Sequence, residues 1–408
     1  MARSKSINQD DLRSHNLSVV LSTLLQANIP LSRAQLAKET GLTKATLSLL
    51  SDILLKNNVV VELPPVRESA NGRPSTPLDI KPKYWVGLGM QINTDGYGCM
   101  AVDLGGNVVA EQWEDCTLEG SDPEAIFVLL DQMVRSLEGK LHRRHCHIAG
   151  SCLALPGLVT TGQRLLMAPN LGWKNIDITQ FAVVQRLQAS VSNEANLAAI
   201  AQIAGYATRN QPGERLLDSK DSFLYISTDI GVGGAFVRDG NVVKGDHGFG
   251  GELGHVSVDM NGPLCRCGRY GCLEMYAGWR ELLKAADIDM NEYAGSRESV
   301  QRLLQLWEQS DDKAVAAIER AMAAIASVAA SSINLLDVDT IVLGGFWSLF
   351  NDQIAQRMLT LIVPQVLAEE ALNLRVVMCA QMQHPALQGA AVYGLRRLID
   401  HPADYLQI

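Results

Sequence analysis

The pattern of hydrophobic and polar residues changes near residue 83 of this chain. Before that point, apolar residues recur three and four positions apart, which is the spacing of one helix face. The first such face consists of Leu17, Val20, Leu21, Leu24 and Leu25. Beyond residue 83, short apolar runs alternate with amphipathic stretches, which is typical of strands that alternate with helices. We therefore expect a small helical unit over residues 1–82, followed by a larger α/β body.

The segment LSRAQLAKETGLTKATLSLLSDILLKNNVV predicts two short helices joined by a turn. Ser32 can cap a helix that runs to Thr40, Gly41 can supply the turn, and Thr43 can cap the second helix. That helix would bury one row of leucines, which are Leu47, Leu50 and Leu54. VVVEL then predicts a strand, and PPVRESANGRPSTPLDI predicts a polar turn with a return strand. Together these features indicate a winged helix–turn–helix.

A winged helix–turn–helix places the first residues of its second helix in the major groove of DNA. The reading positions would be Thr43, Lys44, Ala45, Thr46 and Ser48. Arg73, which lies between a glycine and a proline in the wing, could enter a narrow minor groove or could be a solvated linker residue. Helix–turn–helix shapes also occur as plain packing units. We expect the DNA-binding alternative, with a homodimer or homotetramer on double-stranded operator DNA, because half-site spacing mirrors protein symmetry.

From Tyr84 onward the expected elements form two α/β halves. The first half has three strands in WVGLGMQINTDGYGCMAVDLGGNVV, a helix in DPEAIFVLLDQMVRSL and a strand in HIAGSCLALPGLV. The second has a helix in SNEANLAAIAQIAGYA, a glycine-rich hairpin in SFLYISTDIGVGGAFVRDGNVV, a long alanine-rich helix, the strand DTIVLGG, and a closing strand and helix. This pattern fits a two-lobed, actin-like (ribonuclease H-like) α/β fold. Lobe I would comprise residues 83–194 and 385–408, and lobe II would comprise residues 195–384, with the oligomerisation helices.

Composition and charge indicate where such a protein acts. The net charge is −9, but residues 1–80 carry nine Lys or Arg against seven Asp or Glu, a balance of +2 that leaves −11 for the rest. The uncharged run Ala321 to Leu336 is too short for a bilayer span of about 20 residues, so we expect a buried helix and no membrane partner. No apolar segment follows the basic N-terminal residues, which predicts a cytoplasmic protein. In that reducing compartment, eight cysteines do not indicate a disulfide framework.

Three of the eight cysteines lie with a histidine in GHVSVDMNGPLCRCGRYGCLE. His255, Cys265, Cys267 and Cys272 supply one imidazole and three thiolates, which suit a closed tetrahedral zinc site. A closed site has no open position for chemistry, so the expected cofactor is one structural Zn²⁺ per chain. The alternative is a group of neighbouring residues without an ion.

These motifs resemble those of a known family. From Val86 onward the chain is similar to the ROK family of bacterial repressors and sugar kinases, because GGELGHV followed by CRCGRYGCLE matches that family's signature. With the helical unit in front, the chain resembles the repressor members. The resemblance implies a sugar pocket lined by Asn170, Asn193, Glu194, Glu252, His255 and Glu274. The alternatives are that the two asparagines are turn or capping residues and that Glu252 and Glu274 are solvated charges.

The family includes kinases, so the phosphate-binding turns decide whether an enzyme is expected. Kinases of the family open with Asp-x-Gly-Gly-Thr, whereas this chain has GMQIN, with Gly89 for the aspartate and Asn93 for the threonine. Asp229 stands where the kinases have glycine, and its charge would repel phosphates. Glu194 replaces the catalytic aspartate with a longer side chain. We therefore expect no catalytic residue and no enzyme activity.

The resulting expectation is a sugar-responsive transcriptional repressor, released from its operator by a sugar or sugar phosphate bound between the lobes. A sugar kinase fused to a DNA-binding domain is the alternative. A regulator controlled by a protein partner, as some family members are, is a third possibility.

Overall fold

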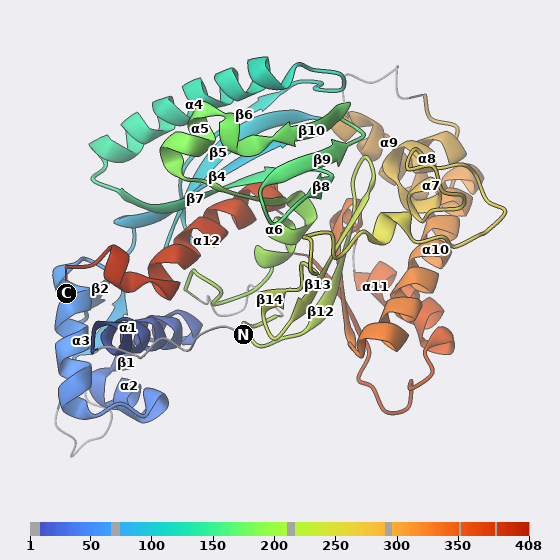
Figure 1. Ribbon diagram of the computed structural model, residues 1–408. Coiled ribbons are helices and arrows are strands. Elements are labelled where there is room, and N and C mark those ends of the chain that lie inside the picture. Colours follow the sequence, from blue (N-terminus) through green and yellow to red (C-terminus); the bar gives the residue numbers. More distant parts are fainter. Residues whose placement is uncertain are drawn as a thin grey trace.

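The computed structural model describes residues 9–66, 74–209, 217–289, 296–350, 352–379 and 382–407. Figure 1 shows a helical N-terminal unit below lobe I, with lobe II beside lobe I. Each lobe is built on a five-stranded sheet. The two-lobed α/β architecture expected from the sequence is confirmed.

The N-terminal unit combines three helices with a three-stranded antiparallel sheet of order β1-β3-β2. Its elements are α1 (Gln9–Gln26), β1 (Leu31–Ser32), α2 (Arg33–Thr40), α3 (Lys44–Lys56), β2 (Val60–Glu62) and β3 (Pro77–Ile80). The five apolar positions predicted for the first helix are all buried. The unit therefore has the core that the spacing predicted.

The predicted caps begin and end α2 and α3. Ser32 accepts a hydrogen bond from the Gln35 main-chain N–H at 3.3 Å, and the Gln35 side chain accepts one from the Ser32 N–H at 2.7 Å, which is a capping box. Gly41 ends α2 with φ of 72°, a left-handed conformation that glycine adopts without strain. Thr43 accepts from the Thr46 N–H at 3.2 Å at the start of α3. Local sequence thus fixes the angle at which α3 leaves α2.

The lobe I sheet has the order β11-β7-β4-β5-β6. Its strands are β4 (Trp85–Asn93), β5 (Gly96–Asp103), β6 (Val108–Asp115), β7 (His147–Leu155) and β11 (Ser190–Asn193). Helices α4 (Pro123–Arg143) and α5 (Ala182–Leu187) cover one face, and α12 (Pro385–Asp400) covers the other (Figure 1). Gly89 allows this close approach, because a side chain there would collide with the main chain of Leu387 and Ala391.

A small antiparallel sheet, of order β10-β9-β8, extends lobe I beside the lobe interface. It consists of β8 (Leu158–Val159), β9 (Arg164–Ala168) and β10 (Trp173–Asp177), followed by the 3-10 helix η1 (Ile178–Gln180). The loop between β9 and β10 carries Asn170.

The helix after β11 is shorter than the sequence suggested. The pattern predicts one helix through SNEANLAAIAQIAGYA, but α6 spans only Glu194–Ile200 and is followed by turns. Gly205 adopts φ of 71°, and a Cβ there would lie 3.1 Å from the Cα of Gln26 in α1. The chain leaves the helix because this segment packs against the N-terminal unit, and such tertiary contacts override helix propensity.

Lobe II has a mixed sheet of order β14-β13-β12-β15-β16. Its strands are β12 (Phe223–Thr228), β13 (Val232–Arg238), β14 (Asn241–Val242), β15 (Thr340–Gly345) and β16 (Arg375–Met378). Its helices are η2 (Leu253–His255), α7 (Glu274–Ala277), α8 (Trp279–Ala285), α9 (Ser296–Glu308), α10 (Asp312–Leu336), η4 (Phe346–Leu349), α11 (Asp352–Ile362) and η5 (Val363–Gln365). Helix α10 packs against α7, α8 and α11.

Helix α10 begins at Asp312, nine residues before Ala321, where the apolar run that predicts this helix starts. Within the described part of the chain it is long and apolar enough to cross a membrane by length and composition, but 61% of its most apolar window is buried inside the protein. A core helix of a soluble protein passes the same test, so this feature is weak support for a membrane span. Its buried alanines match the buried helix that the sequence predicts.

The N-terminal unit and lobe I share one core. A single hydrophobic cluster contains the buried leucines of α1 and α3 together with those of α12, among them Leu17, Leu54 and Leu395. Helix α1 packs against α12 and against the following 3-10 helix η6 (Pro402–Asp404). Arg209 forms an ion pair with Asp79 of β3. The N-terminal unit is therefore fixed to the body by side-chain packing as well as by the chain between them.

Candidate metal centre and ligand site

The four candidate zinc ligands lie around a short hairpin that follows η2. Antiparallel bridges pair Ser257 with Cys272 and Leu264 with Tyr270. Between them the chain turns tightly, because the Cys265 N–H donates to the Arg269 carbonyl at 2.8 Å and the Gly268 N–H donates to the Cys265 carbonyl at 2.9 Å. Gly268 has φ of 89°, which favours glycine at this turn. The turn brings Cys265 and Cys267 to one side of the hairpin and Cys272 to the other.

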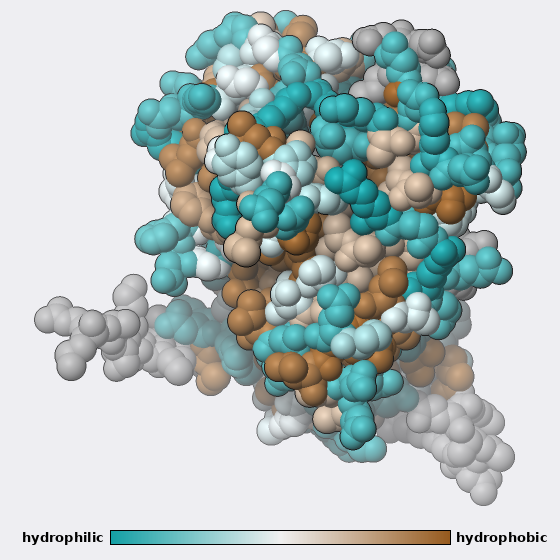
Figure 2. Space-filling view, turned by 90° about the vertical axis from the view of Figure 1, so that its right-hand side faces the viewer, coloured by the Kyte–Doolittle hydropathy of each residue, from teal (hydrophilic) through white to brown (hydrophobic). Residues whose placement is uncertain are grey.

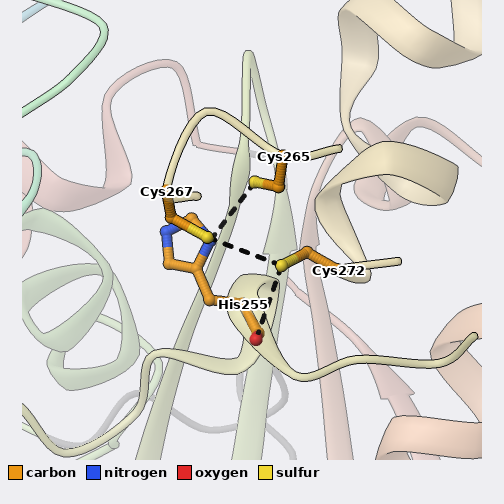
Figure 3. A group of neighbouring side chains, drawn as sticks. All are labelled: His255, Cys265, Cys267 and Cys272. Carbon is orange, nitrogen blue, oxygen red and sulfur yellow. Dashed lines mark hydrogen bonds between the residues drawn. The ribbon is translucent and has the colours of Figure 1, made fainter. Parts of the chain in front are cut away.

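The ligand atoms of His255, Cys265, Cys267 and Cys272 all lie within 4.8 Å of one another. The Cys267 and Cys272 sulfurs are 3.6 Å apart, and the Cys265 sulfur is 3.8 Å from His255 Nδ1. Figure 3 shows the three thiols and the imidazole converging. The predicted grouping of these four residues is therefore confirmed.

The 3.6 Å and 3.8 Å separations are close to those of a tetrahedral zinc site. With Zn–S bonds of about 2.3 Å and a Zn–N bond of about 2.0 Å, the edges of a tetrahedron measure about 3.8 Å between sulfurs and about 3.5 Å between sulfur and nitrogen. Cys265 and Cys272 are buried, and Cys267 and His255 are half-buried. Four ligands of this kind leave no open coordination position, so the site can hold an ion but offers it no place for a reacting molecule.

Glu252, His255 and Glu274 lie together beside the metal cluster. Burial raises the pKa of Glu252, Glu274 raises it further, and His255 lowers it, so the three groups interact electrostatically. Glu252 directly precedes η2, whose last residue is His255, and Glu274 begins α7 directly after the hairpin. The hairpin thus fixes one candidate sugar acceptor on each of its two sides.

Asn170 reaches the same place from lobe I. A Cβ added at Gly231 would lie 3.8 Å from Asn170 Nδ2 and would collide with the Glu274 carboxylate. Asn170 Oδ1 also accepts a hydrogen bond of 3.5 Å from Arg266. Gly231 therefore leaves room for the Glu274 carboxylate, and Asn170 and Glu274 lie near it from the two lobes.

Asn193 and Glu194 start α6 and have different surroundings. Asn193 Oδ1 accepts from the Ala195 N–H at 2.8 Å, and its Nδ2 donates to the Gly157 carbonyl at 3.0 Å. Asn193 therefore caps α6, which is one of the two roles that the sequence allowed. Its Nδ2 keeps one hydrogen that can bond a ligand. Glu194 accepts from Gln91 Nε2 at 3.2 Å. Burial, followed by the charge of Asp229, raises the pKa of Glu194 to about 8.

Asp229 and Asp95 lie near Glu194 at the lobe interface. Asp229 Oδ2 accepts from the Ser227 hydroxyl at 2.9 Å, and burial raises the pKa of Asp229, with a smaller contribution from Asp95. The space around Glu194 is therefore acidic, and burial together with neighbouring carboxyl groups raises the pKa of both Glu194 and Asp229.

The candidate DNA-reading residues form the first turn of α3. Thr43, Lys44, Ala45 and Ser48 are exposed, and Thr46 is half-buried. The Thr43 and Thr46 hydroxyls are 2.9 Å apart. Arg73 lies outside the described residues, so its predicted place in the wing stays a prediction.

Sequence patterns did not reveal three neighbours of this region. Gln91, within GMQIN, stands where the family kinases have a glycine, and it is buried and donates a hydrogen bond to Glu194. Lys244 and Asn196 line a cavity at the lobe interface. Asn196 ends the motif SNEAN without an assigned role in it, and Lys244 lies in no recognisable motif. Their shared cavity forms only when distant segments pack together. A buried polar residue within an apolar helix, as Asn196 is, was the one available signal.

Comparison with known proteins places the chain among regulators and sugar kinases. Residues 89–396 match the ROK family. The xylose repressor of Bacillus subtilis (strain 168) is 30% identical over 278 residues, which cover 68% of this chain and 69% of that protein. The xylose repressor of Caldicellulosiruptor bescii is 25% identical over 407 residues, which cover 96% of this chain and 98% of that protein.

Two solved structures show the same fold. A ROK family transcriptional regulator, described as a homolog of the E. coli MLC protein, has a TM-score of 0.74 at 23% identity and covers 96% of this chain and 97% of its own. A ROK family glucokinase from Streptomyces griseus, in complex with glucose and AMPPNP, has a TM-score of 0.60 at 21% identity and covers 75% of this chain and 98% of its own. Because the family match spans most of the two-lobed body, this chain belongs to the ROK family.

Proposed function

We propose that this protein is a sugar-responsive DNA-binding transcriptional regulator, a repressor of carbohydrate-utilisation genes that leaves its operator when a sugar or sugar phosphate binds between the lobes. The observation that carries this proposal is the single core shared by the N-terminal unit and α12 of the body. A ligand that changes the lobe arrangement can therefore change the position of α3. The names of the two similar xylose repressors support the assignment.

The N-terminal unit serves, in this proposal, as a winged helix–turn–helix. The exposed first turn of α3 offers Thr43, Lys44, Ala45 and Ser48 to base edges and phosphates, with Thr46 beside them. Strands β2 and β3 form the base of the wing, which would carry Arg73 at its tip. Local capping of α3 supports the role, because a reading helix needs a fixed direction.

The sugar pocket lies between the lobes and is lined by Asn170, Asn193, Glu194, Glu252, His255 and Glu274. Sugar hydroxyls are donors that need fixed acceptors, and carboxylate acceptors form the stronger bonds. The close approach of Asn170 and Glu274 around Gly231 supports a pocket that draws on both lobes. Such a pocket binds its ligand best in one arrangement of the lobes.

The zinc ion has a structural role in this proposal, with one ion held per chain by His255, Cys265, Cys267 and Cys272. The site would stabilise the hairpin between Glu252 and Glu274 and contribute to local folding. His255 would bind the ion through one ring nitrogen and face the sugar with the other.

Three features argue against phosphoryl transfer. Glu194 stands where the family kinases have the catalytic aspartate, and its longer side chain moves the carboxyl group away from the position that the reaction requires. Asp229 places a further acidic group beside it. Gly89, which replaces the kinase aspartate, packs against α12 with no room for a side chain. These observations support a regulator over the alternative of a kinase fused to a DNA-binding domain.

The switch is a population shift between lobe arrangements, transmitted to paired N-terminal units in a homodimer or homotetramer. Figure 2 looks onto lobe II and shows hydrophobic side chains among hydrophilic ones. Leu335 at the end of α10 and Leu367 after η5 are 83% and 91% exposed. These leucines support the assignment of oligomerisation to lobe II.

The proposed division of the chain is 1–82 for the DNA-binding unit, 83–194 with 385–408 for lobe I, and 195–384 for lobe II. The packing of α12 on the lobe I sheet supports the return of the chain to lobe I. A regulator of this kind acts in the cytoplasm, on double-stranded DNA and without a membrane partner.

The proposal is tested with the full chain. An operator is selected from random duplex DNA, and its affinity is measured by fluorescence anisotropy while neutral sugars, including xylose, and sugar phosphates are titrated. We expect at least one compound to release the DNA. Saturable ATP-dependent phosphorylation of a sugar would instead support the fused-kinase alternative. Specific DNA binding that no sugar or sugar phosphate alters would indicate control by a protein partner.

A further inference from the structure

A second cavity lies at the lobe interface, next to the proposed sugar pocket. It has a volume of about 230 Å³ and is formed by the loop after β8, strand β11, helices α6 and α12, and the lobe II segment after β14. Of the proposed sugar-pocket residues only Asn193 lines it, whereas Glu194, Glu252, His255 and Glu274 do not. The cavity therefore shares only Asn193, at the start of α6, with the proposed sugar pocket.

Two residues that line this cavity each carry a buried amide oxygen without a hydrogen-bond donor. Asn196 is 3% exposed, lines the cavity, and its Oδ1 has no partner among the residues the structure describes. Gln163 also lines the cavity, and its buried Oε1 has no hydrogen-bond partner among the described residues either. A buried acceptor without a donor is energetically unfavourable. If either amide turns toward the cavity, an occupant with a hydroxyl group can supply the missing donor.

Lys244 adds a positive charge to the cavity wall. Its ammonium lies 5.0 Å from the centre of the Tyr393 ring, which also lines the cavity. No carboxylate of the described residues lies within ion-pair distance of Lys244. The wall of the cavity therefore combines unpaired acceptors with one lysine beside an aromatic ring.

Both lobes contribute to the cavity wall. The Thr161 N–H of lobe I donates to the His247 carbonyl of lobe II at 3.2 Å. Gly248 lies against Val159, and a Cβ there would be 2.7 Å from the Val159 carbonyl oxygen. An occupant of the cavity would touch both lobes next to this bridge, so its affinity would depend on their arrangement.

We propose that this cavity is a second binding site, which takes a monosaccharide-sized polyhydroxylated anion such as a sugar acid or a sugar phosphate. Its hydroxyl groups would donate to Asn196 and Gln163, and its acidic group would bind Lys244. The volume is below the usual range of about 300–1,000 Å³ for ligand pockets, which favours one sugar unit over a nucleotide. Such a site would give the protein a second ligand signal in addition to the sugar between the lobes.

The test is calorimetric titration of the full-length protein with glucose 6-phosphate, gluconate, glucose and inorganic phosphate. We expect at least one of the two sugar anions to bind more tightly than glucose and phosphate. Lys244→Met should weaken that binding about tenfold or more, the loss expected for a charge-assisted hydrogen bond. Asn196→Leu should weaken it as well. The matched control Lys174→Met removes an exposed lysine of β10 that does not line the cavity and should leave the affinity unchanged.

Glu252→Ala distinguishes the two sites. It alters the proposed sugar pocket only, so anion binding at the second site should survive it while sugar binding between the lobes is weakened. Retained binding by Lys244→Met, together with loss in Glu252→Ala, would assign the anion to the first pocket and overturn the proposal. Failure of both sugar anions to bind wild-type protein at millimolar concentration would also overturn it, since the cavity would then hold ordered water only. Each result is independent of operator binding.

Discussion

Asn57 and Gln407 are hydrogen-bonded to each other in both directions across 350 residues of sequence. The Gln407 N–H donates to Asn57 Oδ1 at 2.9 Å, and Asn57 Nδ2 donates to the Gln407 carbonyl at 3.2 Å. Asn57 is the C-cap of α3, and Gln407 follows α12 and η6. In Figure 1 the C-terminus lies next to α3 and β2. Helix α3, the proposed reading helix, is therefore hydrogen-bonded to the C-terminal segment that follows α12, and α12 packs on the lobe I sheet.

Asn57→Ala should uncouple these two parts. Asn57 Nδ2 also donates to the Ile53 carbonyl, so the substitution removes three side-chain hydrogen bonds. Each is worth about 0.5–1.5 kcal/mol, so the free energy of unfolding should fall by about 1.5–4.5 kcal/mol. The larger effect should be on regulation, because α3 loses a connection to the body. The sugar concentration needed to release operator DNA should rise, as measured by fluorescence anisotropy. Asn28→Ala, at an exposed turn of the same unit, is the control. An unchanged release curve for Asn57→Ala would show that the signal reaches α3 by another route.

Removing one zinc ligand should remove the ion. Elemental analysis of the wild type should find one zinc per chain, and Cys265→Ala should contain none, because three ligands hold zinc much more weakly than four. Sugar affinity should fall with the metal, since the hairpin positions Glu252 and Glu274. Cys116→Ala, a half-buried thiol outside the cluster, should keep both. Metal-free wild-type protein with normal sugar affinity would contradict the proposed structural role.

Glu194 should make stability depend on pH. Its pKa is raised from 4.5 to about 8 in the folded protein, so between these values the folded state holds a proton that the unfolded state has released. The free energy of unfolding should therefore decrease as the pH rises from about 5 to 8, because the folded state disfavours the charged form of Glu194. Glu194→Gln should flatten that part of the curve and keep the Gln91 hydrogen bond. Parallel curves for the two proteins in urea unfolding between pH 5 and 8 would exclude a raised pKa.

Local chemistry made the N-terminal unit predictable. The boundaries of α2 and α3 follow from Ser32, Gly41 and Thr43, whose caps act within three residues, and the metal cluster follows from spacing inside one hairpin. The end of α6 was not predictable, because the turn at Gly205 depends on a contact with Gln26, which lies far away in the sequence. The Asn57–Gln407 pair and the cavity beside Lys244 depend on segments far apart in the chain, about which a single sequence carries no pairing information.

Lys44→Ala should weaken operator binding through a lost phosphate or base contact. If Lys44 binds a phosphate, the slope of log affinity against log salt should decrease by about one unit, because one fewer counterion is released. Arg73→Ala should act in the same direction if the wing reaches the minor groove. Lys284→Ala in α8 is the control, since it lies on lobe II. Wild-type affinity and salt slope for both variants would place the reading surface elsewhere.

Glu252→Ala should separate the two functions of the protein. The substitution removes a charged acceptor but leaves His255, Cys265, Cys267 and Cys272 in place, so zinc and the fold should persist. A charge-assisted hydrogen bond is worth about 1.5–3 kcal/mol, so sugar affinity should fall roughly ten- to 150-fold.

Operator affinity without sugar should stay the same in this variant, because DNA is bound by the N-terminal unit. In a gel-shift titration, the complex of Glu252→Ala with operator should survive the sugar concentration that releases the wild type. Glu308→Ala, an exposed glutamate of α9, should behave like the wild type. Release of Glu252→Ala at the wild-type concentration would mean that Glu252 does not bind the sugar, because the loss of a bonded acceptor from a pocket must appear in its affinity.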